Sequence, residues 1–242
     1  MSTLEFYDSH AHEIAPRYEE IDFSAVTDRV RNDIPPGSHI LEVGSGCGRD
    51  SAAFVSAGYR VTAVDGSRTM IREAEKRHPE LRGLITHHVL PAPLPFAKES
   101  FDAAVSFAVI MHLAWNDVAV CITDIARVIR AGGFFAYSVN TRREGLDEGG
   151  RDSVGRMFTA LPAAEWERLH LAAGFETVWR SETDDIVNRD GIRWVTFLAR
   201  KTSWSQRRAD SGSGRDAAWR ASFTPDTACT CARARREAAA AK

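Results

Sequence analysis

Short apolar runs and amphipathic stretches alternate along the first 200 residues of the chain. The apolar runs predict buried strands, which we place at 39–43, 61–65, 84–88, 101–107 and 134–139. The stretches between them predict helices at 50–57, 68–77 and 115–130. Strands that alternate with helices predict an α/β fold, with a parallel sheet covered on both faces.

The two ends of this region have a different pattern. Residues 4–32 read as two helical stretches, which Pro35-Pro36-Gly37 brings to an end. Toward the other end, a helix at 163–173 precedes a pair of strands at 175–181 and 191–200. The whole region is therefore expected to be one domain, long enough to bury a core of its own.

After Arg200 the composition changes to Ser, Ala, Arg and Gly without hydrophobic periodicity. Residues 201–242 hold nine Lys/Arg and four Asp/Glu, a net charge of +5, which leaves −7 for residues 1–200 of a chain at −2. The segment 201–242 is predicted to be a disordered basic tail, with a partner-binding arm as the alternative. The acidic body argues against nucleic acid as a partner, because such binding depends on neutralising phosphates.

The apolar runs, the N-terminus and the cysteines bear on membrane insertion, metal binding and cellular location. No apolar run is long enough to span a membrane, and the acidic, polar N-terminus is unlike a signal peptide. The four cysteines, Cys47, Cys121, Cys229 and Cys231, show no disulfide framework, which favours a reducing, cytoplasmic location. The pair Cys229-x-Cys231 lacks a nearby histidine or second cysteine pair, so we expect no metal site.

The most informative motif follows the first predicted strand. There the chain reads Glu42-x-Gly44-x-Gly46-x-Gly48, and Asp65 ends the second strand seventeen residues after the last glycine. A glycine-rich turn from a strand into a helix, with a carboxylate on the next strand, is typical of a nucleotide-type ligand site. The carboxylate in such a site binds the ligand's hydroxyl groups.

Two cofactor classes use a turn of this kind. The dinucleotide fingerprint G-x-G-x-x-G/A requires a small residue three positions after Gly46, where this chain has Arg49. The acidic Glu42 at the mouth of the loop suits a ligand with a cationic end rather than a diphosphate. An NAD(P) oxidoreductase is therefore the weaker enzyme hypothesis. The plain structural alternative is a turn that binds nothing.

The glycine motif resembles motif I of the class I S-adenosylmethionine (SAM)-dependent methyltransferases, in their small-molecule, type 11/25-like group. The segments 94–107 and 125–134 are similar to the fourth-strand region and to the turn before the fifth strand in that family. The resemblance covers residues 1–200. It implies a seven-stranded, mostly parallel, Rossmann-like sheet with helices on both faces and a C-terminal antiparallel hairpin. It also implies that residues 1–36 form a helical lid and that SAM is the cofactor.

The resemblance further implies which residues surround the methyl donor. Glu42 would lie near the methionine amino group, the three glycines would let the backbone pass close to the ligand, and Asp65 would accept from both ribose hydroxyls. For Arg49 a surface ion pair is the alternative to contact with the methionine carboxylate. The residues expected to bind the cofactor are Glu42, Gly44, Ser45, Gly46, Gly48, Arg49, Asp50, Asp65, Gly66, Met70, Leu90, Phe107 and Ala108.

One position departs from the family pattern. Many relatives carry an Asp about four residues before Leu94-Pro-Phe, where it accepts from the adenine amino group. Leu90 stands at that position in this chain. Adenine recognition is therefore expected to use backbone groups or another side chain.

Methyl transfer from a sulfonium depends mainly on alignment, and a base is needed only when the acceptor arrives protonated. His112, after the fourth strand, is the candidate base, with a structural or substrate-orienting histidine as the alternative. Tyr7 and Tyr18 of the N-terminal segment, and Arg142 after the fifth strand, are expected to contact the acceptor.

The motifs of DNA methyltransferases are missing from the sequence. The loop after the fourth strand has no Pro-Pro pair, and neither Cys47 nor Cys121 follows a proline. With the acidic body, this favours a small-molecule acceptor. The expected function is transfer of the methyl group of SAM to an O or N atom of such a molecule. The alternative is a SAM-binding, catalytically silent partner or regulatory module.

Overall fold

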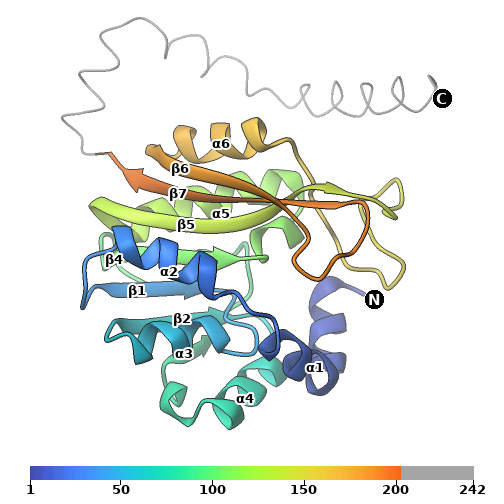
Figure 1. The fold of residues 1–242 in the computed structure, drawn as a ribbon, viewed down its shortest axis with the longest axis horizontal. Helices are drawn as coiled ribbons and strands as arrows, with labels where there is room; N and C mark the ends of the chain where they lie inside the picture. Colours follow the sequence, from blue (N-terminus) through green and yellow to red (C-terminus); the bar gives the residue numbers. More distant parts are fainter. Residues whose placement is uncertain (203–242) are drawn as a thin grey trace, which may run out of the picture. The chain divides into compact units, whose positions relative to one another are not determined.

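The computed structural model describes residues 1–202 and contains a seven-stranded sheet (Figure 1). The strands are β1 (His39–Val43), β2 (Arg60–Asp65), β3 (Ile85–His87), β4 (Phe101–Phe107), β5 (Ile129–Arg143), β6 (Phe175–Asp184) and β7 (Ile192–Lys201). They lie in the order β3-β2-β1-β4-β5-β7-β6. The first five are parallel, and β7 runs antiparallel to both of its neighbours. The predicted α/β fold with its antiparallel hairpin is confirmed.

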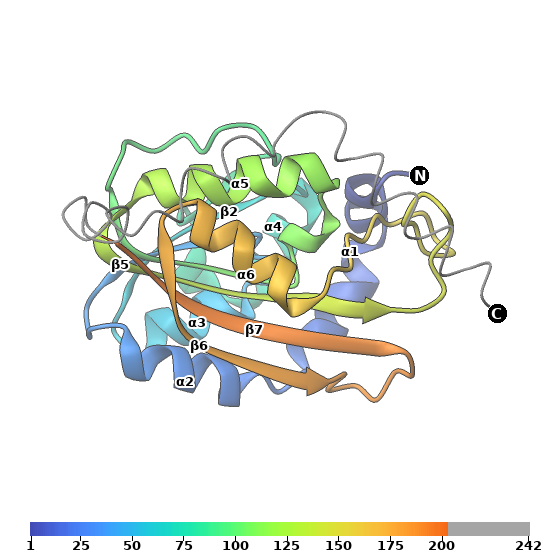
Figure 2. The ribbon, with the colours of Figure 1, turned by 90° about the horizontal axis from the view of Figure 1, so that it is seen from above.

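Helices cover both faces of the sheet (Figure 2). They are α1 (Thr3–Glu19), α2 (Ser24–Asp33), α3 (Arg49–Ser56), α4 (Arg68–Arg77), α5 (Trp115–Val128) and α6 (Ala163–Ala172), with short 3-10 turns η1 (Pro79–Leu81) and η2 (Ile110–His112). Helices α5 and α6 pack on one face, where Ile122 and Trp166 meet Leu41 and Tyr137. Helices α2 and α3 pack on the other face. Because both faces are buried, the parallel strands read as continuous apolar runs.

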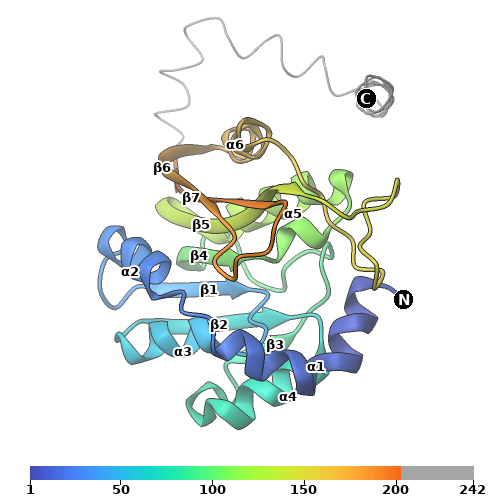
Figure 3. The same ribbon diagram turned by 45° about the vertical axis from the view of Figure 1, so that its right-hand side comes forward.

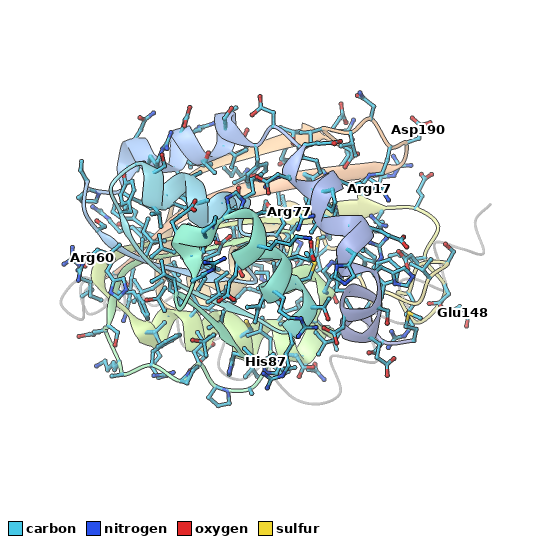
Figure 4. All side chains as sticks on the ribbon, turned by 90° about the horizontal axis from the view of Figure 1, so that it is seen from below. Arg17, Arg60, Arg77, His87, Glu148 and Asp190 are labelled. Atoms are coloured by element: carbon cyan, nitrogen blue, oxygen red, sulfur yellow. The ribbon has the colours of Figure 1, made fainter. Side chains whose placement is uncertain are left out.

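The order of the strands places the site. The chain moves from β1 through β2 to β3 on one side, and from β4 to β5 on the other. Ligands of open α/β sheets bind at such a switch point, beyond the carboxyl ends of the strands. In Figure 4, Arg60 at the amino end of β2 lies at one end of the domain, and Glu148 and Asp190, in the loops after β5 and β6, lie at the other.

Strand β5 is longer than expected, and its irregularities have local causes. It begins at Ile129, so Gly132 and Gly133 lie inside the strand rather than before it. A Cβ on Gly133 would come within 2.4 Å of the Asp102 carbonyl oxygen, so only glycine lets β4 and β5 approach there. Near its other end, the pairing with β7 shifts register between Asn140 and Arg142, the mark of a β-bulge.

Helix α1 is fastened along α4 (Figure 3). The Asp8 carboxylate accepts from the Ser67 hydroxyl at 2.7 Å and from the Thr69 amide at 3.0 Å. His12 and Glu73 pair at 2.7 Å. Ser67 is also the N-cap of α4, and its hydroxyl accepts from the Met70 amide at 3.1 Å. These contacts hold the N-terminal helix beside the site.

Two predictions from the sequence remain as they stood. Of the predicted basic tail at 201–242, the part beyond Thr202 lies outside the described residues. In the part of the chain that the structure describes, no helix is long and apolar enough to cross a membrane.

Candidate functional site

A cavity of about 1030 Å³ lies at the carboxyl ends of the strands. The glycine loop, the end of β2, the turn after β4 and helix α1 all contribute to its wall, as does the hairpin of β6 and β7. Most residues predicted to bind the cofactor line it together: Gly44, Ser45, Gly46, Arg49, Asp50, Asp65, Gly66, Met70, Leu90, Phe107 and Ala108. The volume is at the upper end of the range for small-molecule sites, enough for a cofactor with a small second ligand.

The tip of the glycine loop presents polar groups and open space to this cavity. The side chain of Ser45 is buried, and its hydroxyl has no hydrogen-bond partner among the described residues. Gly46 has φ +53°, and a Cβ added to it would meet only the Met70 methyl group, at 3.8 Å. A ligand can therefore approach the backbone at Gly46 and satisfy the Ser45 hydroxyl.

The other two glycines also allow close packing within the protein. A Cβ on Gly44 would lie 2.4 Å from the Val109 side chain, and a Cβ on Gly48 would lie 2.8 Å from Leu81 and 3.0 Å from Ala74. Gly48 is not among the described residues that line the cavity, and it lies behind the loop, just before α3 begins. Its absent side chain lets the loop pack against α4 and η1.

Asp65 is the carboxylate at the centre of the predicted cofactor half. One of its oxygens accepts from the Gly46 amide at 2.8 Å, and the other accepts from the Ser67 amide at 2.8 Å. Burial raises the pKa of Asp65, while these two backbone donors lower it. Each carboxylate oxygen can accept a further hydrogen bond, so Asp65 is held ready for a pair of hydroxyl donors.

Glu42 lies one layer deeper than expected. Among the described residues it is not part of the cavity wall, and its buried carboxyl group accepts a hydrogen bond from the Ser51 hydroxyl. Burial and the nearby charge of Asp50 hold the pKa of Glu42 well above its usual range. Glu42 is the last but one residue of β1. Strand alternation therefore directs its side chain to one face of the sheet rather than into the loop that follows.

Arg49 forms an ion pair, but an internal one. Its guanidinium binds both carboxylate oxygens of Asp50, at 3.0 and 2.9 Å. It also donates to the carbonyl oxygens of Tyr18 and Ile21, at 3.0 and 3.1 Å. Arg49 thus connects the glycine loop to the end of α1 and the segment after it, and both Arg49 and Asp50 line the cavity.

The turn after β4 carries a backbone outlier at the cavity wall. Ala108 has φ +60°, a conformation that residues other than glycine rarely adopt. Its amide donates to the Ser138 carbonyl oxygen at 3.0 Å, which continues the pairing of β4 with β5. Strained residues of this kind gather at functional sites, because the surrounding structure must hold them.

His112 and Tyr7 meet at the other half of the cavity. The Nδ1 atom of His112 lies 2.7 Å from the Met157 carbonyl oxygen, which assigns the proton to Nδ1. Nε2 is then an acceptor, and the Tyr7 hydroxyl lies 3.2 Å from it. Burial lowers the pKa of His112 to about 4, so the ring is neutral near pH 7. Tyr18, also predicted, lines the cavity with its hydroxyl 3.4 Å from that of Tyr7.

Arg142 is not among the described residues that line the cavity, whereas its neighbour Arg143 is. The Arg142 side chain is 62% exposed and pairs with Glu144 outside the cavity. Arg143 lines the cavity, with its guanidinium 3.7 Å above the Phe158 ring. The bulge after Asn140 inverts the alternation of the strand, so a residue expected to point inward points outward.

The sequence analysis missed the residues that the late loops contribute. Phe158 and Arg156 come from the loop after β5, and Asp185, Arg189 and Trp194 come from the hairpin of β6 and β7. No motif marks them. The only available signal is the density of Arg and Asp between 142 and 156, which has the composition of an ordinary surface loop.

The fold, with a cavity at its switch point, is similar to that of class I, Rossmann-like methyltransferase domains. Residues 41–137 of the chain match the family described as "Methyltransferase domain". This is the family that the glycine motif predicted, and the match spans the loop, Asp65 and the turn after β4.

Two curated relatives agree with this family. An O-methyltransferase of Pyrenophora dematioidea is 35% identical over 101 residues, covering 40% of this chain and 37% of its own length. An uncharacterised methyltransferase of Mycobacterium tuberculosis is 30% identical over 159 residues, covering 66% of this chain and 58% of its own length. The chain thus spans between 37% and 58% of the length of these relatives.

A solved structure has the same fold at low sequence identity. The 1,6-didemethyltoxoflavin-N1-methyltransferase of Burkholderia thailandensis superposes with a TM-score of 0.65 and 21% identity. The match covers 82% of this chain and 87% of that one. That enzyme was crystallised with its acceptor and S-adenosylhomocysteine bound.

Proposed function

We propose that this protein is an enzyme that transfers the methyl group of SAM to an O or N atom of a small-molecule acceptor. The observation that carries the proposal is the arrangement around Asp65, whose carboxylate lies against the Gly46 amide at the tip of the glycine loop. The Asp65 carboxylate faces the cavity, and residues 41–137 match the methyltransferase domain family.

The residues around the loop fit SAM. Asp65 would accept from the two ribose hydroxyls, the unpartnered Ser45 hydroxyl would bind a polar group of the ligand, and the buried Met70 would pack against the adenine. Asp50 would face the methionine amine, and the buried Glu42 lies close behind it. When bound, SAM supplies an activated methyl group on a sulfonium, so the protein's part is to align the acceptor.

The part of the cavity wall around His112 would hold the acceptor. Nε2 of His112 has an available lone pair because the Met157 carbonyl holds the proton on Nδ1. His112 would accept a hydrogen bond or a proton from the acceptor's nucleophile once the Tyr7 hydroxyl moves aside. Tyr18 and α1 would close this half as a lid. A cavity of this volume suits a small molecule rather than a nucleic acid.

The protein would act in a reducing, cytoplasmic setting. Both cysteines among the described residues, Cys47 and Cys121, are free and buried. Burial raises the pKa of each thiol to about 12, so neither is a reactive thiolate near neutral pH.

A SAM-binding module without methyl transfer is the second candidate. Two observations favour it: the apolar Leu90 lines the cavity where many relatives place an acidic residue, and His112 has a pKa of about 4, which makes it a weak base. Incubation with methyl-labelled SAM and a metabolite extract separates the two candidates, since a labelled small molecule excludes the silent module.

Calorimetric titration with S-adenosylhomocysteine tests the cofactor site. We expect binding by the wild type and a loss of at least about tenfold in affinity for Asp65→Ala, because hydrogen bonds to a charged group contribute about 1.5–3 kcal/mol each. Asp184→Ala is the matched control, since that carboxylate is 82% exposed on β6. No binding by the wild type, or unchanged binding by Asp65→Ala, would contradict the proposal.

A further inference from the structure

A largely buried cation at the end of β5, Arg143, shares its carboxylate partner Asp152 with a second arginine. The Arg143 side chain is 10% exposed, and its Nε atom has no hydrogen-bond partner among the described residues. The nearest carboxylate, Asp152, is 3.6 Å from the Arg143 guanidinium, beyond hydrogen-bond distance. A buried guanidinium with so few partners is unusual, because burying a charge without hydrogen bonds is costly.

Asp152 is already occupied by another arginine. Arg156 binds its Oδ2 atom through Nε and Nη2, at 2.9 and 2.7 Å, and donates its own amide to Oδ1 at 2.9 Å. Two guanidiniums therefore share one carboxylate. The group formed by Arg143, Arg156 and Asp152 carries one positive charge that no carboxylate in the group compensates. Burial, with the charges of Arg156 and Arg189, lowers the pKa of Arg143, as expected for a cation in surplus.

The second observation is the position of Arg143 relative to the proposed base. The Arg143 guanidinium stacks on one Phe158 ring at 3.7 Å, and the His112 ring contacts the same Phe158 at 4.5 Å between centroids. All three residues line the cavity. A ligand atom bound by Arg143 therefore lies close to Phe158, the ring that His112 also contacts. A compact molecule can reach Arg143 and His112 together.

We propose, on the basis of the proposed function, that the acceptor is a small carboxylate-bearing molecule whose anionic group binds Arg143 while its nucleophile lies at His112. The planar fork of a guanidinium matches a carboxylate bidentately, and the single surplus charge matches a single negative charge. Phe158 and Trp194 on the cavity wall suit a flat or aromatic body between the two ends.

Matched probes test this without knowledge of the natural acceptor. Benzoate and benzamide have the same ring and nearly the same shape, and differ in charge. We expect calorimetry on the full chain saturated with S-adenosylhomocysteine to show benzoate binding at least about tenfold more tightly than benzamide. Phenyl phosphate binding more tightly than benzoate would overturn the carboxylate assignment, as would equal binding of benzoate and benzamide.

Variants assign the preference to one side chain. Arg143→Gln is expected to abolish the preference for benzoate while retaining S-adenosylhomocysteine binding. Arg142→Gln, the exposed neighbour, is expected to keep the preference. A full preference in Arg143→Gln would overturn the proposal. If Arg143→Gln does not fold, Arg143→Lys replaces it: a preference reduced at least threefold supports bidentate binding, and an unchanged one overturns it.

The outcome is separable from that of the proposed function. If the wild type fails to bind S-adenosylhomocysteine, the assignment as a SAM-dependent enzyme fails. The comparison of benzoate with benzamide on the unliganded chain still reports whether Arg143 binds a carboxylate.

Discussion

At the scale of single residues, the site is a set of polar groups whose protonation states the fold has fixed. The Met157 carbonyl keeps the His112 proton on Nδ1, and burial keeps the ring neutral. The positive charges of Arg156 and Arg143 lower the pKa of His112 further. A carboxylate bound at Arg143 would offset one of those charges and raise the pKa of His112 toward its usual value, making it a better base when the acceptor is present.

The role of His112 is open to a direct test. We expect His112→Ala to lower turnover of methyl-labelled SAM by about 10²–10⁴-fold if it acts as a base, with no change in S-adenosylhomocysteine affinity. Because its pKa is lowered to about 4, the unliganded ring stays neutral at and above pH 5, so protonation of unliganded His112 should not produce an acidic limb in kcat/KM above pH 5. Unchanged turnover in His112→Ala across this range would remove His112 from the mechanism.

At the scale of elements, the glycine loop is a packing device as well as a ligand site. Gly48 begins α3 with φ +86° and is enclosed by α4 and η1. Gly58, after the same helix, has φ +85° but nothing within 4 Å of its position for a Cβ. The two glycines therefore have nearly the same positive φ and differ in their surroundings.

This pair separates backbone strain from packing. Alanine at either position is expected to cost about 1–2 kcal/mol for the left-handed conformation. Gly48→Ala should cost a further ~1–3 kcal/mol, because the rigid Cβ of Ala74 lies 3.0 Å away. Thermal melts should show Gly48→Ala below Gly58→Ala by about 2–4 °C per kcal/mol for a chain of this size. Equal melting temperatures would show that α4 yields to the new methyl group.

At the scale of the whole molecule, the site reduces stability near neutral pH. Glu42 is buried beside Asp50 with a raised pKa, so the folded state resists ionisation that the unfolded chain undergoes freely. Between the usual Glu pKa and the raised value, the folded protein holds a proton that the unfolded chain has lost. The stability that Glu42 contributes is therefore present at acid pH. It is lost as the pH rises through the pKa of Glu42 in the folded state. Proteins keep such unfavourable groups where function requires them.

Glu42→Gln should make this cost visible. We expect the variant to melt at a higher temperature than the wild type at pH 7, by about 2–4 °C for each kcal/mol of stability that the raised pKa of Glu42 removes. The difference should disappear below about pH 4.5, where the carboxyl is protonated in both states. Glu148→Gln, at an exposed position, is the control and should not change the melting temperature. A variant that melts lower at pH 7 would show that ionised Glu42 stabilises the fold.

Local patterns were sufficient for the sheet and for the glycine loop with Asp65 beside it. Helix and strand periods fix which faces are buried, and the glycine spacing with Asp65 depends on a single strand–helix–strand unit, whose geometry is set within about 25 residues. The acceptor half was decided by tertiary structure. It gathers α1, the turn after β4, the loop after β5 and the final hairpin, which are far apart in the chain and carry no shared motif. One bulge in β5 was enough to exchange Arg142 for Arg143, because a shift of one residue turns every later side chain to the other face.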